Sequence, residues 1–592
     1  MRCIKIFVIL FLVVLYLPSA HARTVIVVRD QSSFDGLQGL LEKTLSTSEK
    51  DIYVCFQKGK YIAKEKHISI SGIRKPNTRL YFIGNNSIII PDGREYVDED
   101  VFKGPFDPGN SWILDEEIMD FWSEVKYAET QVEVIDQKSF LCRLKSEERI
   151  ADNPNPEHSY ILIPHWYRSS TYKITKIKDQ YIYFTAADLE ISYNRGYNVN
   201  DDYNIWKKKV RYKLCNVEDV NEGLSINDGR IRLSSISATI REAQMNCFMV
   251  IENSSLSSIA ITGFNYNGNS NYGLSSLLYL SNVYANDIAI NDCCFHGLRS
   301  KAISVLSSNN VRIEDNAFYD CYLGGILSDN GSMSTKVINN TFIRMGKGLK
   351  NTFCVICRGC DYYVSGNKMI DFGYGGIGVG VWYKSPMNIP CRGVSENNDL
   401  SYTKEYLSNI DNNCIMDGGA IYIWTKNERA IIRNNHIHGF SGMAGNRGIF
   451  CDDGAFNVQI IGNVITGIEN SYCIESRRVS SVECTQTPES GIMKSNINVV
   501  IKDNILDGPI LFEGNEIPDN GCIKKSNYIL YSGKGDLPKN SITNIQTPSE
   551  DIVLDYYGET NGKECITTRS SRALKKAKIW RNVRQYFVKV RN

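Results

Sequence analysis

A short asparagine-centred unit recurs along the second half of the chain. It reads IEDNAF (313–318), INNTF (338–342), VSGNKM (364–369), VSENND (394–399), IRNNHI (432–437), IGNVI (461–465) and IKDNIL (501–506), and INDCCF (290–295) has cysteine in the asparagine position. We place the repeated position at residues 293, 316, 340, 367, 397, 435, 463 and 504, so the steps are 23, 24, 27, 30, 38, 28 and 41 residues. A minimum near 23 with additions of variable size is typical of a solenoid whose coils carry inserted loops.

The segments between these asparagines are short, rich in β-branched residues and bounded by Gly, Asn and Asp, which predicts strands. Asparagine at one place in each coil suits a tight bend, because it tolerates a left-handed conformation and can hydrogen-bond to its equivalent one coil away. The sequence therefore predicts an all-β protein, a right-handed parallel β-helix over residues 246–515.

The rest of the chain divides around this solenoid. Residues 23–105 are expected to form an N-terminal cap, with helical spacing over 34–49, followed by the first coils. Over 106–245 the asparagine repeat is lost, and the alternating segment 159–186 predicts an inserted antiparallel β subdomain. Residues 516–592 are expected to form a C-terminal cap, in which the basic amphipathic stretch 571–590 predicts a packed helix.

The first 22 residues have a basic start, an apolar core and the small-x-small ending Ala20-His21-Ala22, a pattern typical of a secretory signal peptide. We therefore expect a secreted or periplasmic protein without a membrane anchor. Lys plus Arg (67) nearly cancels Asp plus Glu (66), so no overall charge favours nucleic acid, and a neutral partner fits best. Nothing in the sequence indicates an oligomeric state.

The chain has 18 cysteines, of which Cys3 lies in the predicted signal peptide, and the remaining 17 form no compact framework. The run CVICRGC (354–360) raises zinc as an alternative, but such spacings inside a strand-rich run more often mark small buried side chains. We predict no resident metal or other cofactor there.

Two aspartate motifs stand out in the region with the largest loop insertions. MDGGAIYIW (416–424) contains Asp417, and GIFCDDGAF (448–456) contains Asp452 and Asp453. The step from Asp417 to Asp452 is 35 residues, close to a loop-bearing coil, so we expect the two motifs to stack on adjacent coils about 4.8 Å apart. Strand alternation lets only one of Asp452 and Asp453 face the groove, and Asp452 is slightly favoured.

Two neighbouring carboxylates suit glycoside hydrolysis, in which one is the acid and the other a nucleophile or base. Ordinary Asp-Gly turns are one alternative, and calcium, which prefers carboxylate ligands, is another. Further candidates for substrate binding are aromatic, imidazole and ionic side chains of the same region: Trp382, Tyr422, Trp424, His436, Arg447 and Glu475. For Arg447 and Glu475 the alternative is a surface salt bridge. His438 matches His296 in the repeat, and a stacking role is favoured for both.

The segments DGGAIYIW, IIRNNHIHGF and GIFCDDGAFNVQIIGNVI resemble secreted bacterial β-helix enzymes of glycoside hydrolase family 141. The resemblance implies a pectate-lyase-like solenoid that acts on a plant or host glycan, with Asp417 as one catalytic carboxylate and Asp452 or Asp453 as the other. A polysaccharide lyase using Arg447, Arg477 or Arg478 on an acidic glycan is the alternative enzyme class. A non-catalytic glycan-binding solenoid is the third hypothesis.

Overall fold

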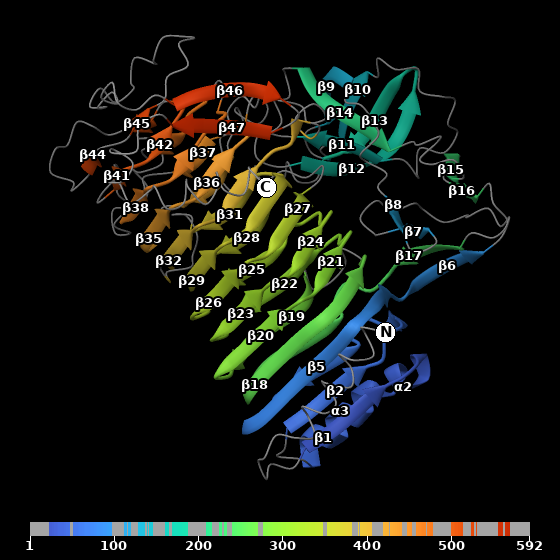
Figure 1. Cartoon of the computed structure of the whole chain (residues 1–592). Coiled ribbons are helices and arrows are strands. Elements are labelled where there is room, and N and C mark those ends of the chain that lie inside the picture. Colours follow the sequence, from blue (N-terminus) through green and yellow to red (C-terminus); the bar gives the residue numbers. More distant parts are fainter. Residues whose placement is uncertain are drawn as a thin grey trace.

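In the computed structural model the chain forms a long parallel β-helix from which one antiparallel insertion projects (Figure 1). This confirms the predicted fold class. Among the described residues no helix has the length and apolar character needed to cross a membrane. The structure describes residues 23–47, 51–97, 112–114, 117–119, 128–136, 139, 141–145, 160–164, 169–186, 209–215, 224–227, 230–233, 239–269, 276–346, 352–381, 389, 391–404, 406, 418–424, 427–440, 447–452, 457–468, 471–476, 499–508, 510–512, 523–525, 528–529, 554–560 and 563–568. The predicted signal peptide and basic helix 571–590 lie outside these residues.

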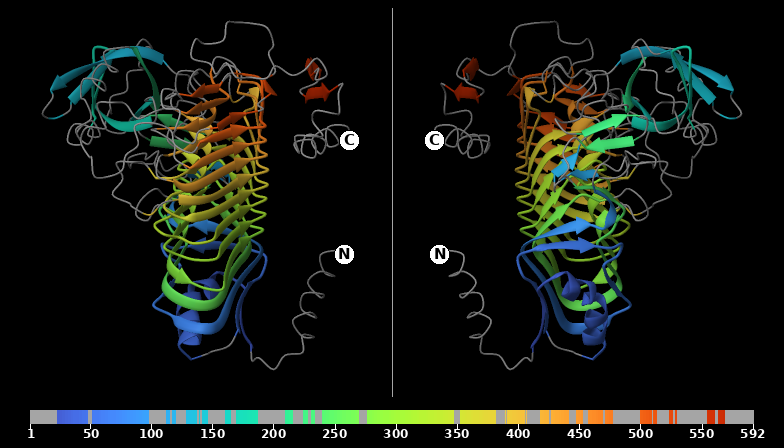
Figure 2. Two further views of the ribbon diagram at one scale, coloured as in Figure 1. Left: turned by 90° about the vertical axis from the view of Figure 1, so that its left-hand side faces the viewer. Right: turned by 90° about the vertical axis from the view of Figure 1, so that its right-hand side faces the viewer.

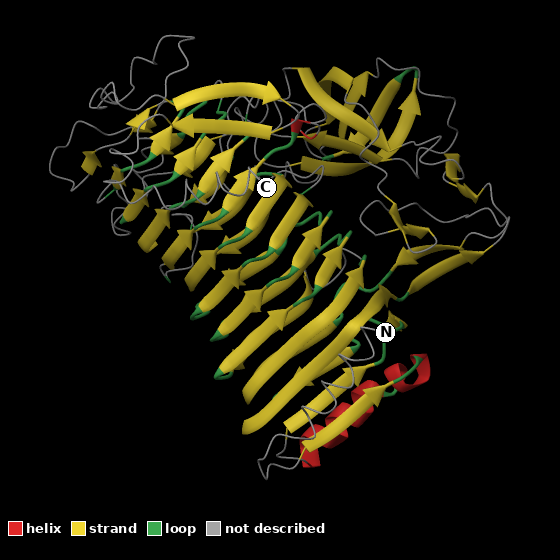
Figure 3. Cartoon of the chain, viewed as in Figure 1, coloured by secondary structure: helices red, strands yellow, loops and turns green. Residues whose placement is uncertain are grey.

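Two helices lie at the N-terminal end of the β-helix, where the sequence suggested a single helical segment over 34–49 (Figure 3). Leu37, Leu41 and Leu45 recur every four residues on the longer helix and are buried in the core. The elements at this end are β1 (Arg23–Val28), α2 (Gln31–Asp35), α3 (Leu37–Thr47), β2 (Asp51–Phe56), β3 (Lys60–Ala63), β4 (Ile68–Ser71), β5 (Arg74–Pro91) and β18 (Met249–Asn267).

Each later coil contributes one strand to each of three faces, and every strand pairs in parallel with its equivalent one coil away. The first face contains β19 (Ser276–Tyr284), β22 (Lys301–Leu306), β25 (Ile326–Asp329), β28 (Phe353–Cys357), β31 (Gly375–Val379), β34 (Gly419–Ile423), β37 (Arg447–Cys451), β40 (Ile474–Ser476) and β43 (Ile510–Phe512). The second face contains β20 (Asp287–Asn291), β23 (Val311–Glu314), β26 (Thr335–Ile338), β29 (Asp361–Ser365), β32 (Cys391–Glu396), β35 (Asn427–Arg433), β38 (Val458–Ile461), β41 (Val500–Lys502) and β44 (Ile523–Lys525). The third face contains β21 (Cys294–His296), β24 (Ala317–Tyr319), β27 (Thr341–Met345), β30 (Lys368–Phe372), β33 (Asp399–Ser401), β36 (His436–His438), β39 (Val464–Ile465), β42 (Ile505–Leu506) and β45 (Tyr528–Ile529). Parallel pairing therefore continues past residue 515, the predicted end of the β-helix.

Stacked side chains fill the core between the three faces. On the third face Phe295, Phe318 and Phe342 lie directly over one another, with ring centroids 4.8 and 4.5 Å apart. The cysteines of the run 354–360 belong to this interior: Cys354, Cys357 and Cys360 are buried, and burial raises the pKa of the Cys354 thiol. Their position agrees with small buried side chains.

A ladder of buried asparagines joins the second face to the third. Each asparagine donates from its backbone N–H and its Nδ2 to the Oδ1 of the asparagine one coil further on. The series begins with the N–H of Cys293 and continues through Asn316, Asn340, Asn367, Asn398, Asn435, Asn463 and Asn504. The hydrogen bonds between equivalent asparagines were expected, whereas the assignment of Asn397 to the repeat was wrong by one residue.

The left-handed backbone conformation belongs to the residue before each ladder asparagine. The φ angles of Asn397 and Asn434 are 57° and 55°, and Asp315 and Gly366 occupy the same place in other coils with 55° and 68°. Asp, Asn and Gly are the residues that adopt this conformation with least strain. The sequence interpretation assigned the bend and the hydrogen bond to one asparagine. In the structure the first residue of each pair makes the bend, and the asparagine after it makes the hydrogen bonds.

The insertion leaves the β-helix after β5 and returns before β18, two strands that pair directly with each other. Figure 2 shows its barrel at the level of the later coils, although the chain leaves the β-helix near the other end. The insertion contains an antiparallel sheet of β6 (Gly93–Val97), β7 (Trp112–Leu114), β8 (Glu117–Met119) and β17 (Thr239–Ala243), a hairpin of β15 (Leu224–Asn227) and β16 (Arg230–Leu233), and a closed barrel of β9 (Ala128–Asp136), β10 (Leu141–Lys145), β11 (Tyr160–Pro164), β12 (Ser169–Lys178), β13 (Tyr181–Thr185) and β14 (Lys209–Cys215). A separate hairpin, β46 (Leu554–Thr560) and β47 (Lys563–Thr568), follows the last coil.

Candidate functional site

The first face carries a row of residues on the side that faces away from the core. Gly378, Tyr422, Phe450 and Glu475 follow one another in register on four successive coils. They alternate with core residues such as Ile421, so they belong to the outer side of this face. All four are nevertheless buried.

Five aromatic side chains gather on this outer side, and we refer to Phe353, Tyr374, Tyr422, Trp424 and Phe450 as the aromatic cluster. Tyr422 lies at its centre, with ring centroids 5.4 Å from Tyr374, 4.9 Å from Trp424 and 5.1 Å from Phe450. Gly378 makes room for Trp424, because a Cβ atom at this position would approach the Trp424 ring to 2.9 Å. Tyr422 and Trp424 were both predicted as substrate contacts, and the structure brings them together.

Asp452 lies at the edge of the aromatic cluster. It directly follows β37, two residues after the outward Phe450, and the phenol of Tyr422 donates a hydrogen bond to its Oδ2. The carboxylate is half-buried. Asp452 is therefore on the outer side of the first face, next to Tyr422.

Arg447 and Glu475 form a buried ion pair beside the same cluster. The Nε of Arg447 lies 2.5 Å from Oε2 of Glu475, and their side chains are only 5% and 0% exposed. The guanidinium also lies over the Phe450 ring, 4.3 Å from its centroid. The alternative of a surface salt bridge is thus half right, since the pair exists but is not at the surface.

The two aspartate motifs lie on adjacent coils, as expected, because β34 pairs in parallel with β37, but Asp452 is matched with the opposite end of the preceding motif from Asp417. Gly419, two residues after Asp417, pairs with Arg447 at the start of β37, whereas Asp452 follows the end of that strand. Asp452 donates its N–H to the carbonyl of Ile423, so its neighbour on the preceding coil is Trp424. Asp417 and Asp453 themselves lie outside the described residues, as do Trp382, Arg477 and Arg478.

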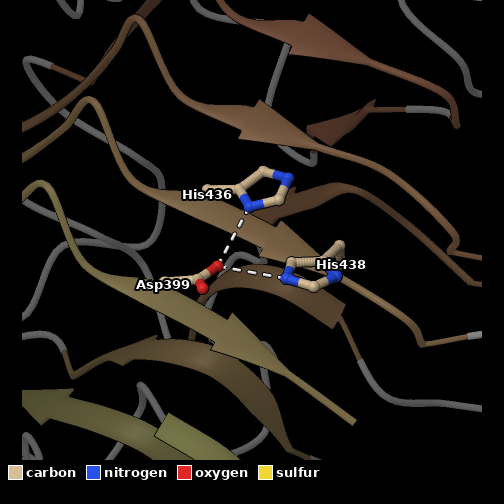
Figure 4. Close-up of side chains that lie close together, drawn as sticks. All are labelled: Asp399, His436 and His438. Atoms are coloured by element: carbon tan, nitrogen blue, oxygen red, sulfur yellow. Dashed lines mark hydrogen bonds and ion pairs between the residues drawn. The ribbon is translucent and has the colours of Figure 1, made fainter. Parts of the chain in front are cut away.

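His436 lies on the outer side of the third face, apart from the aromatic cluster. Its Nδ1 is 2.9 Å from Oδ1 of Asp399, and Nε2 of His438 is 3.0 Å from the same oxygen (Figure 4). The two imidazole rings stack with centroids 4.2 Å apart. Burial opposes ionisation of Asp399, but the hydrogen bonds with His436 and His438 outweigh it and hold the pKa of the carboxyl well below its usual range.

Sequence reasoning missed Asp399 as a partner of His436, although a signal was present. Asp399 follows ladder residue Asn398, just as His436 follows Asn435, so the two side chains occupy equivalent positions on adjacent coils. His438 also lies in register with His296 along the third face, as predicted.

Asp507 is a second carboxyl with a shifted pKa, at the end of the third face. Burial raises its pKa from 3.8 to about 6, although the N–H of Gly467 donates to it and the Cys473 thiol lies 3.6 Å from its Oδ1. Because the folded chain binds this proton more tightly than the unfolded chain does, the contribution of Asp507 to stability is fully present below pH 4 and is lost as the pH rises to about 6.

We predict that Asp507→Asn removes this pH dependence. A shift of about two units corresponds to at most about 3 kcal/mol, which the native chain loses between pH 4 and pH 6 and the variant keeps. Urea unfolding at pH 4, 5, 6 and 7 measures the difference between the two proteins. A difference in stability that does not change with pH would contradict the prediction.

No protein-family model and no curated relative matches the chain. Solved structures do match. A structure described as a glycoside hydrolase is 10% identical, covers 86% of this chain and 96% of its own, and has a TM-score of 0.53. A complex of XylC with xylose is 10% identical over 86% of each chain with a TM-score of 0.37, and PfbA, a surface adhesin of Streptococcus pneumoniae, is 12% identical over 93% and 100% with a TM-score of 0.38. At these identities the first likeness shows a shared β-helix fold.

Proposed function

We propose that the chain is an exported carbohydrate-active enzyme, a glycoside hydrolase in which Asp452 is one of two catalytic carboxylates. The observation that carries this proposal is the place of Asp452 at the edge of the aromatic cluster, with Tyr422 donating to it. Trp424 is the partly exposed ring of the cluster, and it would supply an apolar face with a polar edge for a ring-shaped polar ligand, which a few convergent polar groups would orient. A β-helix neighbour described as a glycoside hydrolase is consistent with this proposal.

The Tyr422 hydrogen bond suggests the role of Asp452. A donated hydrogen bond stabilises an ionised carboxylate more than a protonated one. Asp452 is therefore suited to attack the anomeric carbon, or to deprotonate a water that does so, rather than to protonate the leaving oxygen. We propose Asp417 or Asp453 as the acid. A carboxyl separation of about 5 Å would give retention, and one of roughly 6.5–9.5 Å would give inversion.

The lyase alternative depends on a basic side chain that is available to remove a proton from an acidic sugar. Arg447 does not meet this requirement, because Glu475 and Phe450 hold its guanidinium in a buried position. The remaining candidates of the lyase hypothesis are Arg477 and Arg478. Unsaturated products that absorb ultraviolet light, together with chelator-sensitive turnover, would favour the lyase.

We expect Asp452→Asn to lower kcat by about 100-fold or more on a glycan that the mature protein cleaves, because the amide cannot act as nucleophile or base. A screen of plant and host glycans, with sugar release resolved by chromatography, identifies that substrate. The thermal unfolding midpoint of the variant is measured alongside to show that it folds.

Two further variants serve as controls for this test. Tyr422→Phe keeps the ring and removes the hydrogen bond, so it is expected to change the pH profile of kcat while leaving turnover detectable. Asp361→Asn removes a carboxylate that pairs with Arg392 on the second face, and its turnover should equal that of the native protein. Unchanged turnover in Asp452→Asn would refute the assignment of Asp452.

A further inference from the structure

We propose that Asp399, His436 and His438 bind a divalent transition-metal ion such as Zn²⁺. Among the residues that the structure describes, these three form the one group of His, Cys, Asp and Glu side chains placed closely enough to share an ion. One potential ligand atom from each lies within 4.8 Å of the other two. The site lies on the third face and does not depend on the proposed hydrolase activity.

The β-helix itself places the three ligands. Asp399 pairs in register with His436 on the next coil, and His438 lies two residues further along β36, so all three side chains leave the same side of the sheet. The ligands thus come from two adjacent hydrogen-bonded strands rather than from loops. Sites built on strands hold their geometry more closely than sites built on loops.

The distances suit coordination. Metal–nitrogen and metal–oxygen bonds of about 2.1 Å place adjacent ligands about 3.0 Å apart when the angle at the metal is a right angle, and about 3.4 Å apart when it is tetrahedral. Asp399 Oδ1 already lies 2.9 Å from Nδ1 of His436 and 3.0 Å from Nε2 of His438. An ion would replace these two hydrogen bonds with small movements of the rings.

The ligand types select the class of ion. Imidazole nitrogen suits zinc, copper, iron and nickel, whereas calcium takes six to eight oxygen ligands. Three protein ligands leave further coordination positions for water or a bound ligand. The side chains of His436, His438 and Asp399 are 19%, 20% and 39% exposed, so an ion can reach them from solvent.

His296 provides an internal comparison. It occupies the same column of the third face as His438, and its Nδ1 lies 3.1 Å from Oδ1 of Asn267 while its Nε2 lies 3.6 Å from Asp320. This histidine links neighbouring coils, but the described residues around it include no second imidazole that would complete an ion site. Replacing His296 therefore tests the loss of a contact between coils without the loss of a proposed metal ligand.

The test is calorimetric titration of ZnCl₂ into the mature protein, prepared without a polyhistidine tag and dialysed against EDTA. We expect His436→Gln and His438→Gln each to remove one equivalent of Zn²⁺ or to weaken its binding at least 100-fold, and Asp399→Asn to weaken it about tenfold. His296→Gln should bind Zn²⁺ like the native protein, and CaCl₂ should not compete. Circular dichroism in EDTA shows whether each variant folds.

The histidine variants keep every cysteine, so Zn²⁺ that binds only to thiols would bind equally to the variants and to the native protein. Co²⁺ provides an independent readout, because its visible absorption spectrum should be lost in both histidine variants and kept in Asp452→Asn. Equal Zn²⁺ stoichiometry and affinity in the native protein and in folded His436→Gln and His438→Gln would overturn the proposal, as would the absence of Zn²⁺ binding to the native protein.

Discussion

Replacing Glu475 by alanine is expected to lower the free energy of unfolding by about 3–5 kcal/mol, because it leaves the Arg447 guanidinium buried without its carboxylate. Both side chains are almost fully excluded from water, and their contact at 2.5 Å lies beside the Phe450 ring. Removing one member of such a pair is much more harmful than removing both. Urea unfolding followed by circular dichroism measures the change.

The double variant Arg447→Met with Glu475→Leu is the decisive companion to this experiment. It fills similar volume without a buried charge and should recover most of the stability that Glu475→Ala loses. The exposed pair of Arg392 and Asp361 offers a matched control, since Asp361→Ala should change stability by at most about 1 kcal/mol. If Glu475→Ala is no more harmful than Asp361→Ala, the ion pair is not a structural element of the first face.

Replacing Asn398 by alanine is expected to destabilise the chain by a similar amount, about 3–5 kcal/mol, because several buried polar groups lose their partners together. Its Oδ1 accepts from the N–H and Nδ2 of Asn367, and its own Nδ2 donates to Val364 and Asn435. Alanine supplies none of these contacts. Asn398→Asp keeps the shape but loses the donor, so we expect it to be at least as harmful.

The neighbouring residue provides the control for the ladder. Asn397 is exposed and has a left-handed backbone, so Asn397→Gly keeps the conformation and should change stability by only a few tenths of a kcal/mol. Unfolding midpoints of the two variants, measured in parallel, should therefore differ widely. Equal midpoints would show that the hydrogen bonds of Asn398 do not hold the coils together.

The asparagine repeat was sufficient to predict the β-helix, because the buried ladder requires an asparagine at the same place in successive coils. It was not sufficient to fix the phase where two asparagines adjoin, as at Asn397 and Asn398. That single residue matters, since counting from Asn397 puts Asp399 on the opposite side of its strand from His436. Counting from Asn398 places both one residue after the ladder and reveals their pairing.

The register of the aspartate motifs could not be obtained in the same way. Between the third face and the first face each coil carries a loop of its own length, so residue counting across it does not show which first-face residues are neighbours. The 35-residue step from Asp417 to Asp452 matched a plausible coil, yet the true neighbour of Asp452 is Trp424. The burial of Arg447 and Glu475 was equally hidden, because strand alternation does not show how far an outer-side residue is excluded from water.

The place of the insertion has a consequence for the order in which the coils close during synthesis. β5 pairs with β18, but the whole stretch from residue 92 to residue 248 must be made before β18 exists. Until then β5 presents an open sheet edge to its surroundings. Every later coil follows its predecessor after a much shorter stretch, so growth from β18 onward can keep pace with the emerging polypeptide. Among the described coils, the pairing of β5 with β18 is thus the step that cannot occur until a long insertion has been synthesised.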